Sequence, residues 1–239
     1  MKYDFEKYVD SFKKIMTDTW LTPRGAMFSE GFALSSIIHE CESQLIIESG
    51  TAYGGSAEML ALLCKKKPLI SIDNYELYPD SEQYSKDRMQ KYKDVKLLKG
   101  DSLQLIPEIL EITNLQKIAI FIDGPKGENA GNFVFSLLHE FREKIDFIAV
   151  HDVKYDSESA EIYNRTFSDL IPSNILYTDD PQDYFSFFRE QIDNHMLQIN
   201  KQKCKESVSS LKKIEGLGFL QSALQESPRG YGMVIIKPE

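Results

Sequence analysis

Short apolar runs alternate with segments of helical periodicity through the middle of the chain. The runs are about four to six residues long and lie at Gln44–Ser49, Pro68–Asp73, Val95–Leu98, Ile118–Asp123 and Phe147–His151. Between them, apolar residues recur every three or four positions near Ser56–Lys66, Ser81–Tyr92, Leu103–Glu111 and Asn129–Lys144. Strand-length runs separated by helix-length segments predict βαβ units, and therefore a doubly wound α/β fold around a mostly parallel sheet.

The two ends of the chain extend this core. Helical periodicity near residues 3–18 and 29–41 predicts an N-terminal helical cover over residues 1–42. The α/β core, residues 43–180, ends with a helix near 159–170 and a strand at Ile175–Thr178. Residues 181–228 are predicted to form a mostly helical insertion, and residues 229–239 to hold the seventh strand at Gly232–Lys237. We interpret the insertion as additional core and a homodimer interface, with a substrate lid as the alternative.

Composition narrows the class of protein. The 239 residues are 42% hydrophobic and 27% charged, as in ordinary globular proteins, and the net charge of -9 argues against a nucleic-acid partner. No apolar run approaches the roughly 20 residues that span a bilayer, and the N-terminus lacks the apolar block of a signal peptide. Three widely spaced cysteines without CxxC spacing argue against a disulfide framework. We therefore expect a cytoplasmic protein without a membrane partner.

A glycine-rich turn follows the first predicted strand, in the sequence IIESGTAYGGSAEML. The strand ends at Glu48, Gly50 begins a tight turn, and a later glycine pair lets the backbone approach a ligand. Ser56 is placed to cap the next helix and to meet a polar ligand group. The G-x-x-x-G-G spacing differs from the G-x-G-x-x-G of dinucleotide sites, which weighs against an NAD-dependent dehydrogenase.

Polar residues end several of the predicted strands. Four such residues are Ser49, Asp73, Asp123 and His151. Open α/β sheets gather their ligands at these carboxyl ends. Asp73 can bind two ribose hydroxyls, because a carboxylate offers two acceptor oxygens. After the third strand, Asp101 and Ser102 would lie beside an adenine bound in the same crevice.

Four motifs in order, ESGTAYGGSA, SIDN, GDSLQLIPEIL and FIDGPKG, resemble the class I S-adenosylmethionine-dependent O-methyltransferases of the catechol and caffeoyl-CoA type. They are also similar to the macrocin-type relatives that methylate sugars, whose FIDG and HD motifs are closer. The leader RGAMFSEGFALSSII resembles the segment that folds an N-terminal helix over the cofactor. The resemblance covers about residues 22 to 155 and implies a Rossmann-like methyltransferase fold. It also implies methyl transfer from S-adenosylmethionine to a hydroxyl of a small molecule, a sugar or an aromatic compound.

The resemblance also implies a role for each matching residue. The cofactor positions fall on Glu48, Gly50 and Ser56 at the methionine end, on Asp73 at the ribose, and on Asp101 and Ser102 at the adenine. Asp123 falls on a position that binds both a divalent metal and the cofactor near its methyl group, and Lys126 falls on that of the proposed general base. His151-Asp152 falls where catechol-type enzymes carry an Asp-Asn metal pair.

The histidine at that pair is a departure from the catechol type. Magnesium prefers oxygen ligands, so a magnesium site here would depend on Asp123 and Asp152, whereas a histidine ligand also suits manganese, zinc or iron. Either His151 or Lys126 could take the substrate proton, and we favour His151 because imidazole titrates near neutral pH.

Two alternatives to a methyltransferase share the same motifs. The first is a catalytically degenerate methyltransferase fold that serves as a binding protein, which the altered metal pair keeps open. The second is a relative of the cephalosporin hydroxylase group, whose FIDGPKG-like and HD segments are similar. Bound redox-active iron would favour oxidation, and magnesium would favour methyl transfer.

Overall fold

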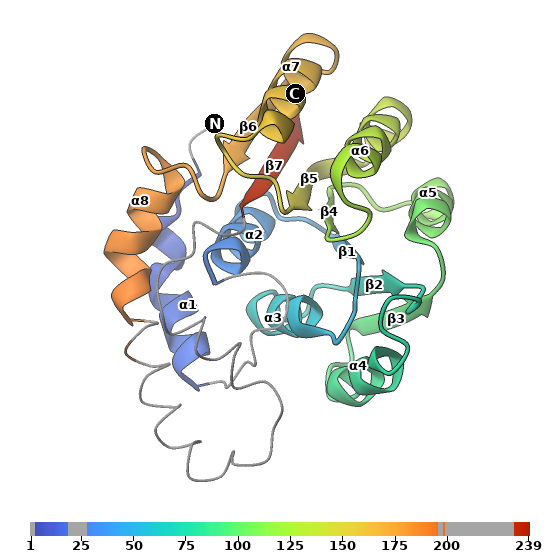
Figure 1. Cartoon of the computed structure of the whole chain (residues 1–239). Helices are drawn as coiled ribbons and strands as arrows, with labels where there is room; N and C mark the ends of the chain where they lie inside the picture. The colour runs from blue at the N-terminus through green and yellow to red at the C-terminus, as the bar shows by residue number, and fades with distance from the viewer. Residues whose placement is uncertain (1–2, 19–27, 196–197, 199–231) are drawn as a thin grey trace.

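A twisted seven-stranded sheet forms the centre of the computed structural model, which describes residues 3–18, 28–195, 198 and 232–239 (Figure 1). The strand order is β3-β2-β1-β4-β5-β7-β6. The strands are β1 Leu45–Ser49, β2 Leu69–Asp73, β3 Val95–Lys99, β4 Ile118–Ile122, β5 Ile145–His151, β6 Ser173–Tyr177 and β7 Met233–Pro238. The first five pair in parallel, and β7 runs antiparallel to both β5 and β6. The predicted doubly wound, mostly parallel sheet is confirmed.

Helices cover both faces of the sheet (Figure 1). They are α1 Glu6–Asp18, α2 Phe28–Glu40, α3 Gly55–Leu63, α4 Ser81–Met89, α5 Ser102–Ile112, α6 Gly127–Phe141, α7 Glu158–Asp169 and α8 Tyr184–Phe188, followed by a π-helical turn at Arg189–Asp193. One apolar cluster joins α1, α2, α3 and α8 to the sheet, and a second joins α5, α6 and α7 to its opposite face. Strands β1, β4 and β5 are buried along their whole length. A strand covered on both faces must be apolar throughout, which explains the continuous apolar runs.

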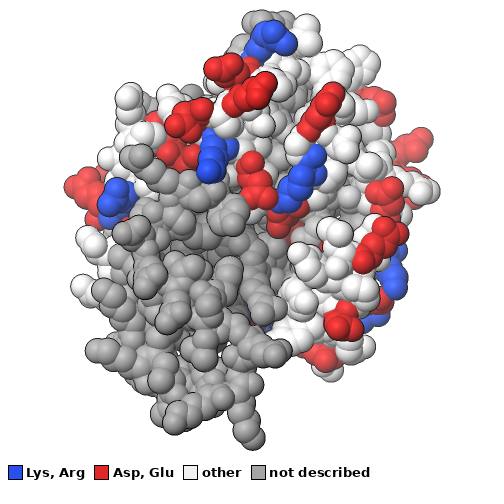
Figure 2. All heavy atoms as spheres, viewed as in Figure 1, with Lys and Arg blue, Asp and Glu red and all other residues white. Residues whose placement is uncertain are grey.

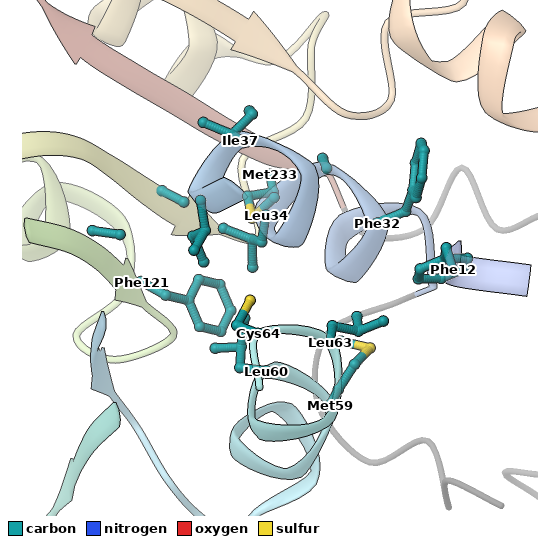
Figure 3. Close-up of a cluster of buried hydrophobic side chains, with 14 of the residues drawn as sticks. Phe12, Phe32, Leu34, Ile37, Met59, Leu60, Leu63, Cys64, Phe121 and Met233 are labelled. Carbon is teal, nitrogen blue, oxygen red and sulfur yellow. The ribbon is translucent and has the colours of Figure 1, made fainter. Parts of the chain in front are cut away.

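Helix α2 lies inside the first cluster (Figure 3). Its Phe32 and Ile37 are fully buried, and Phe12 of α1 packs edge-on against Phe32 at 5.0 Å between ring centroids. A Cβ added to Gly31 would lie 2.4 Å from the Met59 sulfur of α3, so a larger residue here would displace the end of the Met59 side chain. Burying a side chain such as Phe or Ile stabilises the fold by about 1.5–3 kcal/mol. Helix α2 is therefore an integral part of the core.

Residues 181–195 are the described part of the predicted insertion. Tyr184, Phe185, Phe188 and Ile192 are buried in the cluster that contains α1 and α2. The Tyr184 hydroxyl donates a hydrogen bond to the carbonyl of Ser29. This part of the insertion thus adds to the core, and most of the predicted remainder, residues 199–228, lies outside the described residues. Among the described helices, none has the length and apolar character needed to cross a bilayer.

Candidate functional site

The loops at the carboxyl ends of β1 to β4 surround a cleft of about 470 Å³. Its volume is within the range of small-molecule sites. Six of the predicted site residues line it, namely Gly50, Asp73, Asp101, Ser102, Asp123 and Lys126. The first four form what we call the strand-end wall. Glu48, Ser56, His151 and Asp152 do not line this cleft, so they would act from behind it or beside it.

Gly50 brings the ends of three strands together. Its φ of 99° is a left-handed conformation, and a Cβ there would lie 3.2 Å from backbone atoms of Asp123 and Gly124. The Gly50 N–H donates to the carbonyl of Ile72 at 2.8 Å. The Asp123 N–H donates to the carbonyl of Ser49, also at 2.8 Å. A side chain at Gly50 would therefore strain the backbone and push the wall away from Asp123.

Asp73 is held by the backbone of two loops. Its Oδ2 accepts from the N–H of Ala52 at 2.7 Å, and its Oδ1 accepts from the N–H of Tyr75 at 2.6 Å. Each carboxylate oxygen keeps a second lone pair for a ligand hydroxyl. The structure thus places Asp73 at the cleft in a fixed orientation, as binding of a ribose would require.

Asp101 and Ser102 occupy the start of α5. Asp101 caps the helix, because its carboxylate accepts from the N–H of Leu103 at 2.9 Å. The Ser102 hydroxyl lies 2.6 Å from that of Ser49. Both residues therefore have a structural role as well as a place in the cleft, so their presence is explained even without a ligand.

Glu48 is fully buried at the end of β1, one residue before the cleft. The hydroxyl of Ser71 donates to its Oε2, whereas its Oε1 has no hydrogen-bond partner among the described residues. Burial raises the pKa of Glu48 to about 7, with the Ser56 and Ser71 hydroxyls opposing this rise and the charges of Asp123 and Asp73 adding to it. A buried acceptor without a partner is uncommon, which makes Glu48 a candidate site residue behind the cleft.

Four charged side chains meet beside the cleft, and we call Asp123, Lys126, His151 and Asp152 the charged cluster. His151 Nδ1 lies 3.0 Å from Asp123 Oδ1 and 3.1 Å from Asp152 Oδ1. Lys126 donates to Asp123 and, at 2.6 Å, to Asp152 Oδ2. Asp152 has a φ of 63°, a costly conformation for a residue other than glycine that is often found at functional sites.

A fifth charged residue, Glu30 of α2, completes this arrangement. Its carboxylate is 0% exposed, and its Oε2 lies 3.1 Å from His151 Nε2. Glu30 is not among the site residues predicted from the sequence. The signal that could have found it is a carboxylate near the start of an otherwise apolar helix, in FSEGFALSSII. Such a residue is expensive to bury unless it has a partner.

The mutual contacts of the cluster determine its protonation. Burial alone would lower the pKa of His151, but its hydrogen bonds to Asp123, Asp152 and Glu30 raise it to about 12. The hydrogen bond from His151, with help from Lys126, holds the pKa of Asp152 well below its usual value. Burial alone would lower the pKa of Lys126, but Asp123 and Asp152 raise it. Three carboxylates thus surround two cations.

Three members of the charged cluster could hold a metal ion. Asp123, His151 and Asp152 each offer one ligand atom, and these atoms lie within 4.8 Å of one another. Two carboxylate oxygens and one imidazole nitrogen are a donor set that fits a divalent ion accepting both oxygen and nitrogen, such as manganese. Lys126 contacts the same two carboxylates, so a bound ion would replace it there.

Known proteins resemble this chain both in sequence and in structure. The sequence model of the rhamnosyl O-methyltransferase/CmcI family matches residues 15–169, and no curated protein matches the chain. The O-methyltransferase from Bacillus cereus in complex with SAH has a similar structure, with a TM-score of 0.54 and 13% identity, covering 100% of this chain and 92% of that one. The O-methyltransferase TomG from Streptomyces achromogenes, involved in tomaymycin synthesis and in complex with SAM, has a TM-score of 0.48 and 14% identity, covering 100% and 91%.

The structural similarity and the family match support different conclusions about this chain. Structural similarity at 13% identity establishes the fold, while the family match spans more than half of the chain, from α1 to α7. It includes all of the strand-end wall and the charged cluster. The expected class I superfamily is therefore confirmed. The chain belongs to the rhamnosyl O-methyltransferase/CmcI family and is an S-adenosylmethionine-dependent O-methyltransferase.

Proposed function

We propose that this protein transfers a methyl group to a hydroxyl oxygen of a small molecule, a sugar in preference to an aromatic compound, with the assistance of a divalent metal ion. The cofactor would lie in the cleft against the strand-end wall, and the acceptor would lie at the charged cluster. In this proposal Asp73 binds the ribose, Asp101 and Ser102 lie beside the adenine, and the buried Glu48 faces the methionine end.

The position of Asp123 carries the proposal. Its side chain belongs both to the cleft and to the charged cluster, and its backbone follows β4, the central strand next to β1. A metal ion bound there would be adjacent to the cofactor, so an acceptor hydroxyl on the ion would be close to the transferred methyl group. Holding the two reacting centres in line is the main contribution that a protein can make to this displacement.

When bound, the cofactor supplies a methyl group on a sulfonium sulfur that leaves as a neutral thioether, and the metal ion supplies a Lewis acid for the attacking hydroxyl. Asp123, His151 and Asp152 would hold the ion. The strand-end wall would orient the methyl group, because Asp73 is fixed by two backbone N–H groups and Gly50 allows close approach.

In this proposal Lys126, and not His151, takes the substrate proton. His151 already uses Nε2 on Glu30, and Nδ1 faces Asp123 and Asp152, so neither nitrogen is available to the acceptor. Lys126 lines the cleft and owes its raised pKa to the same two carboxylates. With those carboxylates bound to an ion, Lys126 would lose its proton more easily and could then accept the hydroxyl proton.

The description of the matching family and the charge of the protein surface both support a sugar as the acceptor. The family description names a rhamnosyl O-methyltransferase, and the hydroxyl pairs of a sugar suit a carboxylate-bound ion. Acidic side chains are spread over the described part of the face in Figure 2, with the basic ones lying among them. This distribution and the net charge of -9 favour a small neutral acceptor over nucleic acid, and we retain the expectation of a cytoplasmic enzyme.

Isothermal titration with S-adenosylhomocysteine, with NAD as control, tests the cofactor half of the proposal. We expect micromolar binding that Asp73→Ala weakens by about 100-fold or more, because two charge-assisted hydrogen bonds are lost. Asp73→Asn is the matched variant, since it retains one acceptor oxygen and should lose less. Absence of binding under every metal condition would favour a degenerate binding protein.

Methyl transfer to rhamnose-containing glycosides tests the acceptor half. Radiolabelled methyl transfer should require manganese or magnesium and should cease after chelation, and restoring the ion should restore it. Transfer that is unaffected by chelation would contradict metal assistance. Iron-dependent oxidation of the acceptor, in place of methylation, would favour the hydroxylase-like alternative.

A further inference from the structure

We propose that Glu30 is a positioning residue, which holds the His151 ring with Nδ1 turned toward Asp123 and Asp152. Through this contact the N-terminal helix α2 would set the geometry of the metal site. The inference rests on the proposed function for its metal, but the orientation of His151 can be tested without one.

The His151 ring is constrained on two sides. Glu30 Oε2 lies 3.1 Å from Nε2, and the ring of Phe121 meets the imidazole edge-on at 6.2 Å between centroids and 90° between planes. Only 9% of His151 is exposed. With Nε2 and one ring side occupied, rotation of the ring would break the bond to Glu30, so Nδ1 stays on the side of the carboxylates.

The chemistry of imidazole makes this contact useful. A neutral imidazole carries its proton on one nitrogen and a lone pair on the other. A metal ion that replaces the Nδ1 proton would bind the Nδ1 lone pair on the side of Asp123 and Asp152, while Nε2–H still donates to Glu30. Metal-binding histidines commonly donate their second N–H to a carboxylate, which selects the tautomer and orients the ring.

The core holds Glu30 in place. The neighbouring Gly31 packs against Met59, and Phe32 packs against Phe12, so α2 has little freedom to move. A carboxylate that is 0% exposed in such a core is costly unless it is paired with a charge or hydrogen-bonded. An apolar residue here would give a more stable core, so the bond to His151 accounts for the presence of a carboxylate.

The test compares Glu30→Ala and Glu30→Gln with the wild type by manganese titration and by NMR of ¹⁵N-labelled histidine. We expect Glu30→Ala to weaken manganese binding by about 10- to 100-fold and to abolish the hydrogen-bonded Nε2–H signal of His151. Glu30→Gln should retain the signal and most of the affinity, because its amide oxygen still accepts from Nε2–H. S-adenosylhomocysteine binding without metal should change by less than about twofold in both variants.

Glu58→Gln is the control for loss of a buried carboxylate. Glu58 lies in α3 and pairs with Arg88 at 2.5 Å, away from the charged cluster. Its substitution should lower the melting temperature without affecting manganese affinity or the His151 signal.

A folded Glu30→Ala variant with unchanged manganese affinity and an unchanged His151 signal would overturn the inference. If the wild type binds no divalent ion at all, metal assistance fails, and the NMR result still decides the role of Glu30. Loss of the Nε2–H signal in Glu30→Ala alone would support positioning of the ring, and its persistence would refute it.

Discussion

The strand-end wall and the charged cluster are neighbours in the cleft, but they are built differently. Asp73 is held by the backbone of its own loop and of the preceding turn, and Asp101 by the first turn of its own helix. The charged cluster joins side chains from the loop after β4 and the end of β5, and Glu30 of α2, which contacts the cluster, is 121 residues from His151. Backbone N–H groups orient the carboxylates of the wall, whereas contacts between charged side chains hold the cluster together.

This difference has an energetic consequence. Residues of the wall have separate partners, so their substitutions should be nearly additive. In the charged cluster, each group determines the protonation of the others, so one substitution should alter several of them. Four predictions test the contrast, beginning with the largest expected effect and ending with the smallest.

Asp123→Asn should have the largest effect, because Asp123 belongs to both regions. We expect the methyl-transfer rate to fall by about 1,000-fold, since the variant removes a charge from the reacting centre and one ligand of the ion. Steady-state kinetics with saturating cofactor measure this loss. Asp101→Asn, which removes a carboxylate from the same cleft but preserves the helix cap, should cost less than about tenfold. Equal losses in the two variants would argue against the special position of Asp123.

Gly50→Ala should damage the wall alone. The left-handed φ of 99° and the 3.2 Å approach to Asp123 and Gly124 should reduce stability by about 1–3 kcal/mol and weaken S-adenosylhomocysteine binding about tenfold. Chemical denaturation and calorimetry measure the two quantities. Manganese affinity should change by less than about twofold. A large change in manganese affinity would mean that the two regions are coupled through the backbone.

Lys126→Met should separate metal binding from catalysis. Removing the ammonium that contacts Asp123 and Asp152 should tighten manganese binding about tenfold, because the ion no longer competes with a bound cation. The methyl-transfer rate should nevertheless fall by about 100-fold if Lys126 takes the proton. Lys86→Met, at an exposed ion pair with Glu82, is the matched control. A variant with weaker manganese binding would contradict competition at the carboxylates.

Glu48→Gln should produce the smallest change, visible as a pH dependence of stability. Because the native pKa of about 7 exceeds the ordinary value of 4.5, native Glu48 retains a proton that the unfolded chain has lost between these limits. Wild-type stability therefore falls as pH rises through this window, and the variant removes that fall. Its stability relative to wild type should rise by about 1 kcal/mol from pH 5.5 to 6.5 in urea denaturation. A pH-independent difference would contradict a raised pKa.

Most of the fold could be predicted from residue order. Strands β1, β2 and β4 lie where the apolar runs end at Ser49, Asp73 and Asp123, within a residue or two. Strand β6 begins at Ser173, two residues before the predicted Ile175, because an edge strand has a weaker apolar pattern. The sequence predicts helix α2 as part of a cover over the core, whereas in the structure α2 packs between α1, α3 and α8. Helical periodicity alone does not distinguish a helix on the outside of a protein from one that is enclosed.

The sequence by itself determined the order of strands and helices, the Gly50 turn and the acidic residue that ends β2. Each of these depends on backbone preferences and burial of neighbouring residues, which act over short separations along the chain. Only the tertiary structure decided that Glu30 meets His151, that Lys126 lies between two carboxylates, and that the His151 nitrogens are both engaged. Those contacts join residues distant in sequence, and their charges acquire defined protonation states only when burial brings them within hydrogen-bond distance.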